Sequence, residues 1–223
     1  MRYDWDFGVF WPYGWAFARG LCVTIELSFL TSVAGTVLGI LLGPVLRVRG
    51  LSWWLLPFND IARAVPLLVL IFLFYYFPYR DLLGISAPSP FVAAFLALTV
   101  SQAVFTADLV RAAVDGVSRQ TVLGARALGL KESTIWRYLI LPDIVRQIAP
   151  AMVAFYIGNI KLSSLASVIG CQEIVFTARV AMGQTYRSLE AWLIVAGIYI
   201  LLVLPFAWAA RRLERSEWLK RRT

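Results

Sequence analysis

"ARALGLKESTIWRYLILPDIVR", residues 125–146, is a long polar stretch inside an otherwise apolar chain. Its apolar residues recur at nearly helical spacing on both sides of Gly129, and Pro142 stands near its end. Glycine tolerates the positive φ that turns a chain sharply between two helices. The sequence therefore predicts a short, basic helix-turn-helix within a loop over residues 118–146.

The segments that flank this loop are apolar enough to cross a lipid bilayer. The chain has 223 residues, of which 60% are hydrophobic, and a mean hydropathy of +0.74. Soluble domains are about 45–50% apolar, and about 20 apolar residues cross a membrane. We predict an all-α membrane protein with a single domain over residues 1–223. Its five transmembrane helices are expected at residues 21–46, 53–77, 91–110, 148–171 and 191–210.

The basic residues predict the orientation of these helices. Thirteen Lys and Arg residues fall in the segments after the first, third and fifth spans, whereas five fall in the segments on the other side. The positive-inside rule places the N-terminus outside and the C-terminus in the cytoplasm. The net charge of +8 is thus a topology signal, and we expect no nucleic-acid partner.

Several classes of chemistry are excluded by composition. The chain has no histidine, which removes histidine metal sites and Ser-His catalysis. It also lacks the Gly-x-x-x-x-Gly-Lys-Ser/Thr motif of P-loop nucleotide binding. Cys22 and Cys171 stand in apolar surroundings and are expected to be structural thiols. We expect no catalytic residue, metal or cofactor in this chain.

Ordered segments along most of the chain resemble permeases of bacterial ABC importers. "ARALGL", followed by "LP" at residues 141–142, resembles the EAA loop of that family. Four further segments are similar to the polar amino acid branch and occur in the same order: "RAVPLLVLIFLFYYFP" (63–78), "ADLVRAAVDGV" (107–117), "LPDIVRQIAP" (141–150) and "KLSSLASVIGCQEI" (161–174).

This resemblance implies a type I ABC importer permease of the bacterial inner membrane, which imports a polar amino acid or a related small zwitterion. It implies cytoplasmic ATPase subunits that bind ATP and Mg²⁺, a second permease subunit in a homo- or heterodimer, and an external solute-binding protein. The loop residues implied to contact the ATPase are Gly124, Ala125, Arg126, Ala127, Leu128, Gly129 and Leu130. Leu123 stands where the family usually has a glutamate, so the docking shape is expected without that polar contact.

Ionisable residues within the expected spans form two candidate pairs. A charge at bilayer depth costs at least ~2.5–3.5 kcal/mol on insertion scales, so it normally finds a partner. Asp60 and Arg63 are three residues apart, as are Asp108 and Arg111, and each pair can share one helix face. We expect two local ion pairs that brace the bundle.

Glu26 and Lys161 have no opposite charge one turn away. Lys161, with Ser163 and Ser164, either lines a translocation path or pairs with an acidic residue of its own chain, for which Asp60, Asp108 and Glu26 are the candidates. Glu26 either attracts a cationic group of a substrate or extends outward to the membrane surface.

Two other classes of function remain as alternatives. One is a secondary transporter or channel driven by an ion gradient, although such proteins often have more spans and inverted repeats. The other is a non-transporting scaffold that anchors a cytoplasmic partner through the basic loop. The docking loop argues against the first, and the intramembrane charges argue against the second.

Overall fold

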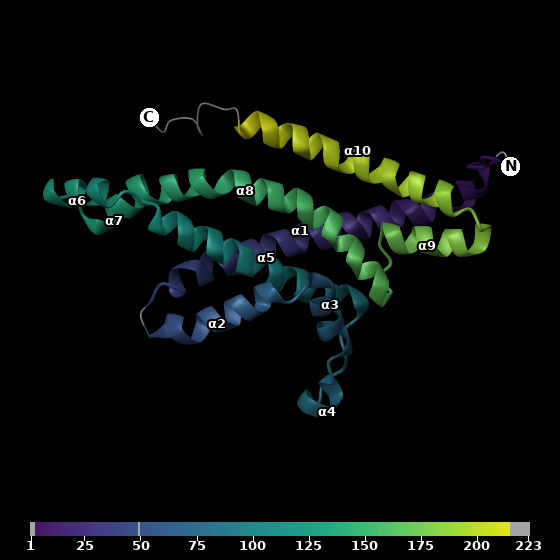
Figure 1. Ribbon diagram of the computed structural model, residues 1–223, viewed down its shortest axis with the longest axis horizontal. Coiled ribbons are helices and arrows are strands. Elements are labelled where there is room, and N and C mark those ends of the chain that lie inside the picture. Colours follow the sequence, from purple (N-terminus) through teal and green to yellow (C-terminus); the bar gives the residue numbers. More distant parts are fainter. Residues whose placement is uncertain (1–2, 49, 215–223) are drawn as a thin grey trace.

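The computed structural model describes residues 3–48 and 50–214, and every regular element in that part of the chain is a helix. Helices α1, α5, α8 and α10 run lengthwise beside one another, with α6 and α7 at one end and α9 at the other (Figure 1). The α-helices are α1 (Gly14–Val45), α2 (Leu51–Ala64), α3 (Leu67–Tyr76), α4 (Tyr79–Leu83), α5 (Pro90–Asp115), α6 (Arg119–Ala127), α7 (Glu132–Ile135), α8 (Leu141–Leu162), α9 (Ile174–Thr185) and α10 (Ser188–Glu214). Two 3₁₀ segments, η1 (Gly8–Tyr13) and η3 (Ser163–Ile169), and one π-helical segment, η2 (Trp136–Ile140), complete the described elements.

Four continuous helical stretches are long and apolar enough to cross a membrane. They are Gly8–Val45, Pro90–Asp115, Glu132–Ile169 and Ser188–Arg212, and the bent pair of α2 and α3 makes a fifth candidate span. The helical stretches extend beyond the apolar segments of the sequence because polar residues at their ends continue the same helices. The all-α membrane fold is therefore confirmed.

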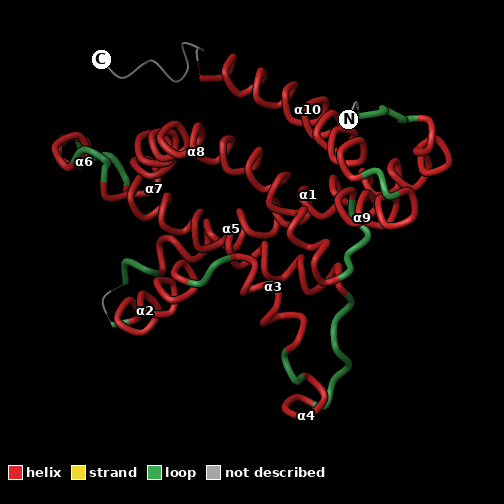
Figure 2. The backbone as a smooth tube through the Cα atoms, turned by 45° about the vertical axis from the view of Figure 1, so that its right-hand side comes forward, coloured by secondary structure: helices red, strands yellow, loops and turns green. Residues whose placement is uncertain are grey.

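The second span is not the continuous helix that the sequence analysis predicts over residues 53–77. It breaks at Val65 and Pro66, where α2 and α3 meet at an angle of 103°. Proline disfavours helical geometry in the preceding residue, and Val65 is accordingly extended, with φ −78° and ψ 124°. Figure 2 shows that the chain then continues through α3 to the short α4, which projects away from the other helices.

Helices α1 and α5 pack closely through glycines spaced four residues apart. A Cβ atom on Gly35 would lie 2.4 Å from Cβ of Gln102, and one on Gly39 would lie 2.4 Å from Cβ of Thr106. Gly43 continues the same stripe against α5. Small residues at this spacing let two membrane helices approach to backbone distance. The α1–α5 pair is thus the central contact of the bundle.

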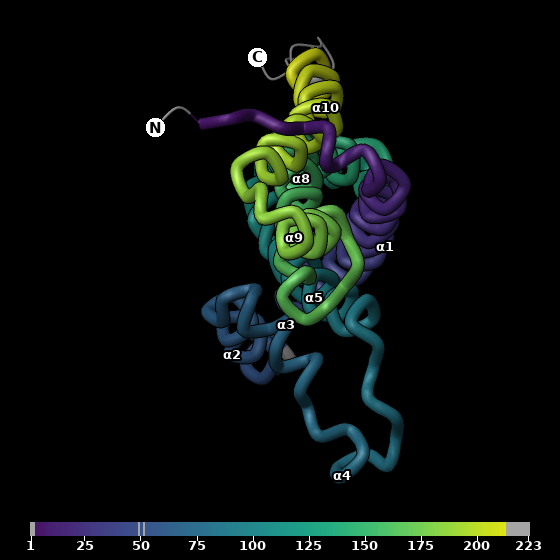
Figure 3. The backbone as a smooth tube through the Cα atoms, turned by 90° about the vertical axis from the view of Figure 1, so that its right-hand side faces the viewer, coloured from purple at the N-terminus to yellow at the C-terminus, as the bar shows by residue number. Residues whose placement is uncertain are grey.

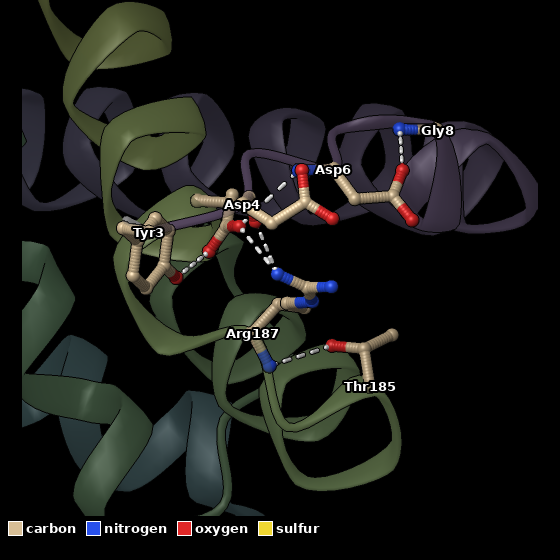
Figure 4. A network of polar contacts seen from close by, with 7 residues as sticks. Tyr3, Asp4, Asp6, Gly8, Thr185 and Arg187 are labelled. Atoms are coloured by element: carbon tan, nitrogen blue, oxygen red, sulfur yellow. Dashed lines mark hydrogen bonds and ion pairs between the residues drawn. The ribbon is translucent and has the colours of Figure 1, made fainter. Parts of the chain in front are cut away.

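The N-terminal segment is fixed to the turn between α9 and α10 by a buried carboxylate (Figure 4). The fully buried Glu190 accepts a hydrogen bond from the Tyr3 hydroxyl at 2.6 Å and one from the Asp6 backbone N–H at 3.4 Å. Arg187 donates to the Asp4 carbonyl at 2.5 Å and lies 3.5 Å from the Glu190 carboxylate. These contacts hold the segment before η1 and α1 against the start of α10.

Candidate functional site

A cluster of charges lies where the broken second span meets α5. The Asp108 carboxylate is 2.6 Å from the Arg63 guanidinium, and it also accepts a hydrogen bond from the Asn59 amide at 3.2 Å. Arg111 lies 3.8 Å from the same carboxylate, one helical turn further along α5. Asp108 is therefore the centre of the cluster and connects α2 to α5.

This arrangement corrects one of the two expected ion pairs. The Asp108–Arg111 pair is present, but Arg63 reaches across to Asp108 instead of pairing with Asp60 on its own helix. Among the described residues, Asp60 has no ion pair, and it is exposed. The reason is the packing of α2 against α5, which brings a carboxylate from a neighbouring helix closer to Arg63 than the one a turn away.

A cavity of about 560 Å³ opens beside the cluster. The break at Pro66 shapes one wall, because the last turn of α2 and the first residues of α3 both line the cavity. The other walls come from α5 and from Phe155 of α8, which stacks on Phe105 with ring centroids 4.1 Å apart. Arg63 and Asp108 are the charged residues of the lining. The volume falls in the range of small-molecule sites, about 300–1,000 Å³.

The residues expected to line a translocation path lie outside this cavity. Lys161 is exposed at the end of α8, and it does not line the cavity of Arg63 and Asp108. The hydroxyls of Ser163 and Ser164 donate to the carbonyls of Ile160 and Lys161, at 2.8 and 2.7 Å, so they satisfy the end of the helix. Within the described part of the chain Lys161 makes no ion pair, so of its two alternatives the structure does not support pairing with Asp60, Asp108 or Glu26.

Glu26 is exposed on α1 and, like Lys161, has no ion pair among the residues that the structure describes. It is absent from the lining of the charged cavity. Of the residues singled out from the sequence, the structure thus brings Arg63, Asp108 and Arg111 together and leaves Glu26 and Lys161 apart from them.

The predicted helix-turn-helix is present at the end of α5. Helix α6 begins after Ser118, whose hydroxyl accepts a hydrogen bond from the Thr121 N–H at 3.3 Å. The helix ends in a Schellman turn, in which Gly129 N–H donates to Arg126 O at 2.9 Å and Leu130 N–H donates to Ala125 O at 3.2 Å. Gly129 has a φ of +74°, the left-handed conformation that favours glycine.

An ion pair and a small core hold α6, the turn and α7 together as one unit. Arg126 binds Glu132 with two hydrogen bonds, of 2.5 and 3.2 Å, across the turn. Below it, Ala125 and Ile135 pack with Ala113 at the end of α5 and with two isoleucines of η2 and α8. The unit is therefore joined directly to both flanking transmembrane helices.

The outward surface of the unit carries two exposed leucines. Leu128 is 82% exposed and Leu123 is 51% exposed, while Gly124, Arg126 and Ala127 are also exposed. Of the seven residues expected to contact the ATPase, Ala125 is the one that points into the core, where it is buried.

Sequence reasoning missed two amides that hold the helices in place. Asn59 lies four residues before Arg63, so the same α2 face carries both groups that contact Asp108. Asn159 is buried and donates to Thr31 Oγ1 at 2.8 Å and to Ser32 Oγ at 3.0 Å, which links α8 to α1. Each is a polar residue inside an apolar segment, and that pattern is the signal that could have found them.

Comparison with known proteins agrees with this architecture. Residues 35–218 match the family described as binding-protein-dependent transport system inner membrane component. The chain is 30% identical over 220 residues to the glutamine transport system permease protein GlnP of Escherichia coli strain K12, with 96% of this chain and 98% of that protein covered. It is also 30% identical over 200 residues to the arginine transport system permease protein ArtQ of Bacillus subtilis strain 168, with 89% and 90% covered.

Solved structures show the same fold. An amino acid ABC transporter crystallised with histidines has a chain that is 28% identical, with a TM-score of 0.85 and coverage of 96% of this chain and 99% of that one. A chain of the inward-facing MetNI methionine ABC transporter shares the fold at 22% identity and a TM-score of 0.71, over 92% of this chain and 97% of that one. The helical arrangement is that of a type I ABC importer permease. The chain belongs to the inner membrane component family of binding-protein-dependent transport systems and is a multi-pass inner membrane protein.

Proposed function

We propose that this chain is the permease subunit of an ABC importer that moves a polar amino acid, or a related small zwitterion, through the cavity beside Arg63 and Asp108. The names of its relatives support an amino acid substrate, since they include glutamine and arginine permeases. The observation that carries the proposal is the position of Asp108 between two arginines, beside a cavity of ligand size.

The cluster has the charges that a zwitterion requires. Arg63 and Arg111 are 56% and 34% exposed, so both guanidinium groups retain N–H donors that face outward. Arginine matches the planar geometry of a carboxylate with two parallel hydrogen bonds. Asp108, which lines the cavity, supplies the negative charge that an ammonium group needs. A substrate carboxylate would compete with Asp108 for Arg63, so binding and rearrangement of the α2–α5 contact would occur together.

The cytoplasmic unit supplies the connection to ATP hydrolysis. The exposed Leu123 on α6 and Leu128 at its C-cap suit an apolar groove on a partner ATPase, which would bind ATP and Mg²⁺, with no cofactor held by this chain. In this proposal the N-terminus lies outside, as the distribution of basic residues predicts. A second permease subunit and an external solute-binding protein would complete the importer, and this chain itself would not be an enzyme.

Uptake of labelled amino acids into proteoliposomes that contain the permease and its ATPase tests the proposal. Asp108→Asn keeps the side-chain shape and removes the charge that holds Arg63, and we expect uptake to fall at least about tenfold, a change that corresponds to about 1.4 kcal/mol. Asp115→Asn is the matched control, because Asp115 lies on the same helix and pairs with Arg47 at 2.8 Å, outside the cavity lining.

Assembly and basal ATP hydrolysis are measured for both variants to show that the complexes are intact. Uptake by an intact Asp108→Asn complex at the rate of the Asp115→Asn complex would contradict the proposed path. Uptake that persists without ATP and follows an ion gradient would replace the importer by a secondary transporter.

A further inference from the structure

A second cavity, of about 600 Å³, lies between α1, α8 and α10. These helices are neighbours on one side of the bundle, as the end-on view shows (Figure 3). Large apolar side chains form most of the wall, among them Phe29 and Val33 of α1, Ile157 of α8 and Phe206 of α10. All four lie within candidate membrane spans, so this groove faces the depth of the hydrocarbon core.

The polar side chains in the groove wall already have partners within the protein. The hydroxyls of Thr36 and Tyr156 bond to each other at 2.9 Å, and Ser28 donates at 2.6 Å to the carbonyl four residues earlier. Ser32 accepts a hydrogen bond from Asn159 at 3.0 Å. Among the described residues, the buried side-chain atoms that lack a partner lie outside this wall. The groove therefore suits a hydrocarbon and offers little to a polar solute, in contrast to the cavity beside Asp108.

The length of the groove suits an acyl chain. Its lining on α1 runs from Ile25 to Val37, which is about 18 Å at 1.5 Å per residue. One leaflet of a ~30 Å hydrocarbon core is about 15 Å deep, so an acyl chain that starts at one end of the groove spans most of this length.

One end of the groove carries positive charge. Ala209 and Ala210 line that end, and the next two residues of α10, Arg211 and Arg212, are both exposed. The Arg212 guanidinium lies 4.0 Å from the ring centroid of Trp208. Tryptophan is typical of the membrane–water interface, and arginine binds a phosphate with two parallel hydrogen bonds. The charged end thus lies at headgroup depth.

We propose that this groove is a binding site for an anionic phospholipid, with an acyl chain along α1, α8 and α10 and the phosphate held by Arg211 and Arg212. This is a site separate from the solute path. The lipid proposal rests on the proposed function in one respect, which is the membrane leaflet that supplies the lipid. The proposed orientation places Arg211 and Arg212 at the cytoplasmic surface, so the lipid would belong to the cytoplasmic leaflet.

Photo-crosslinking locates the lipid on the assembled transporter. The complex of permease and ATPase is reconstituted with phosphatidylglycerol or phosphatidylcholine carrying the same diazirine-labelled acyl chain, irradiated and mapped by mass spectrometry. We expect labels on α1, α8 and α10 at the groove. Ala209→Trp fills the groove and should lower this labelling at least fivefold. Leu201→Trp is the control, since Leu201 is 77% exposed on the same helix and lies outside the lining.

A second variant tests whether Arg211 and Arg212 bind the phosphate of the lipid headgroup. Replacing both Arg211 and Arg212 by Gln should reduce labelling by phosphatidylglycerol to the level given by phosphatidylcholine, while the latter stays unchanged. Equal labelling by both lipids in the unmodified protein would overturn the phosphate site. Groove labelling that Ala209→Trp leaves unchanged, or crosslinks from the groove to a second permease chain, would overturn the acyl-chain site. Labelling requires neither solute nor ATP, so failure of transport and failure of lipid binding are seen separately.

Discussion

Gly129→Pro tests whether the helix-turn-helix transmits force between the permease and an ATPase. Gly129 has a φ of +74°, whereas proline fixes φ near −65°, a difference of about 140°. Proline also lacks the N–H that donates to Arg126 O at 2.9 Å in the Schellman turn. The substitution therefore prevents the turn from closing, while the transmembrane helices are left unchanged.

The cost can be worked out from the same geometry. A proline in an incompatible backbone position costs about 3 kcal/mol or more, a figure that includes the hydrogen bond lost with its N–H. Gly129→Ala keeps the N–H and carries the smaller cost of a left-handed residue, about 1–2 kcal/mol. Gly197→Ala is the control, because Gly197 lies in helix α10 with open space around it, and alanine there is favoured by about 0.5–1 kcal/mol.

Solute-stimulated ATP hydrolysis by the reconstituted complex measures the effect. We expect full stimulation for Gly197→Ala, reduced stimulation for Gly129→Ala and none for Gly129→Pro, with equal amounts of permease in the membrane. A Gly129→Pro complex with the stimulation of the unmodified protein would refute the role of this turn in coupling.

Two further predictions concern stability in detergent. Gly39→Ala places a Cβ 2.4 Å from Cβ of Thr106, and we expect this overpacking to cost about 1–3 kcal/mol and to lower the Tm. Gly197→Ala is the control, because a Cβ there meets open space and should leave the Tm unchanged. Equal Tm values for the two variants would contradict the close α1–α5 contact. Glu173 lies outside the spans, and its burial raises the pKa of its carboxyl group from an ordinary value near 4.5 to about 7. Between these two pH values the folded state binds a proton that the unfolded state has released. The free energy of unfolding therefore falls as pH rises through this interval, by about 3 kcal/mol at most. The Tm of the unmodified protein should therefore decline from pH 5 to 8 relative to that of Glu173→Gln. The glutamine stays neutral and can still accept the hydrogen bond from Phe176 N–H. Parallel Tm profiles for the two proteins would contradict the raised pKa of Glu173.

The parts of the fold that follow from local patterns could be predicted from the sequence. Apolar length identifies the spans, and the glycine between two helical patterns identifies the turn at Gly129. Pro66 indicates a disturbance of the helix at this position, but the sequence alone does not predict whether the span has a small kink or a bend of 103°. That angle depends on how α3 packs against α5 and the other helices.

The charge cluster shows the limit of reasoning along one helix. Spacing alone pairs Asp60 with Arg63 as readily as Asp108 with Arg111, because both pairs are three residues apart. Which carboxylate Arg63 selects is decided by the distance between α2 and α5, a contact between segments 45 residues apart in the chain. The same limit applies to Lys161, whose position at the end of α8 is set by the 3₁₀ segment that follows it.

The small core joins the helix-turn-helix unit to α5, so the unit and this helix are expected to move together. Ala113, which packs in this core, and Asp108, which binds Arg63, are five residues apart on α5, or about 7.5 Å along its axis. Arg63 belongs to α2, which is absent from that core. In the proposed importer, a displacement applied at α6 would act on Asp108 through α5 and on Arg63 only through the α2–α5 contact, so the length of the Arg63–Asp108 ion pair would report the position of this unit. By reciprocity, a solute that draws Arg63 away from Asp108 changes the load on that unit.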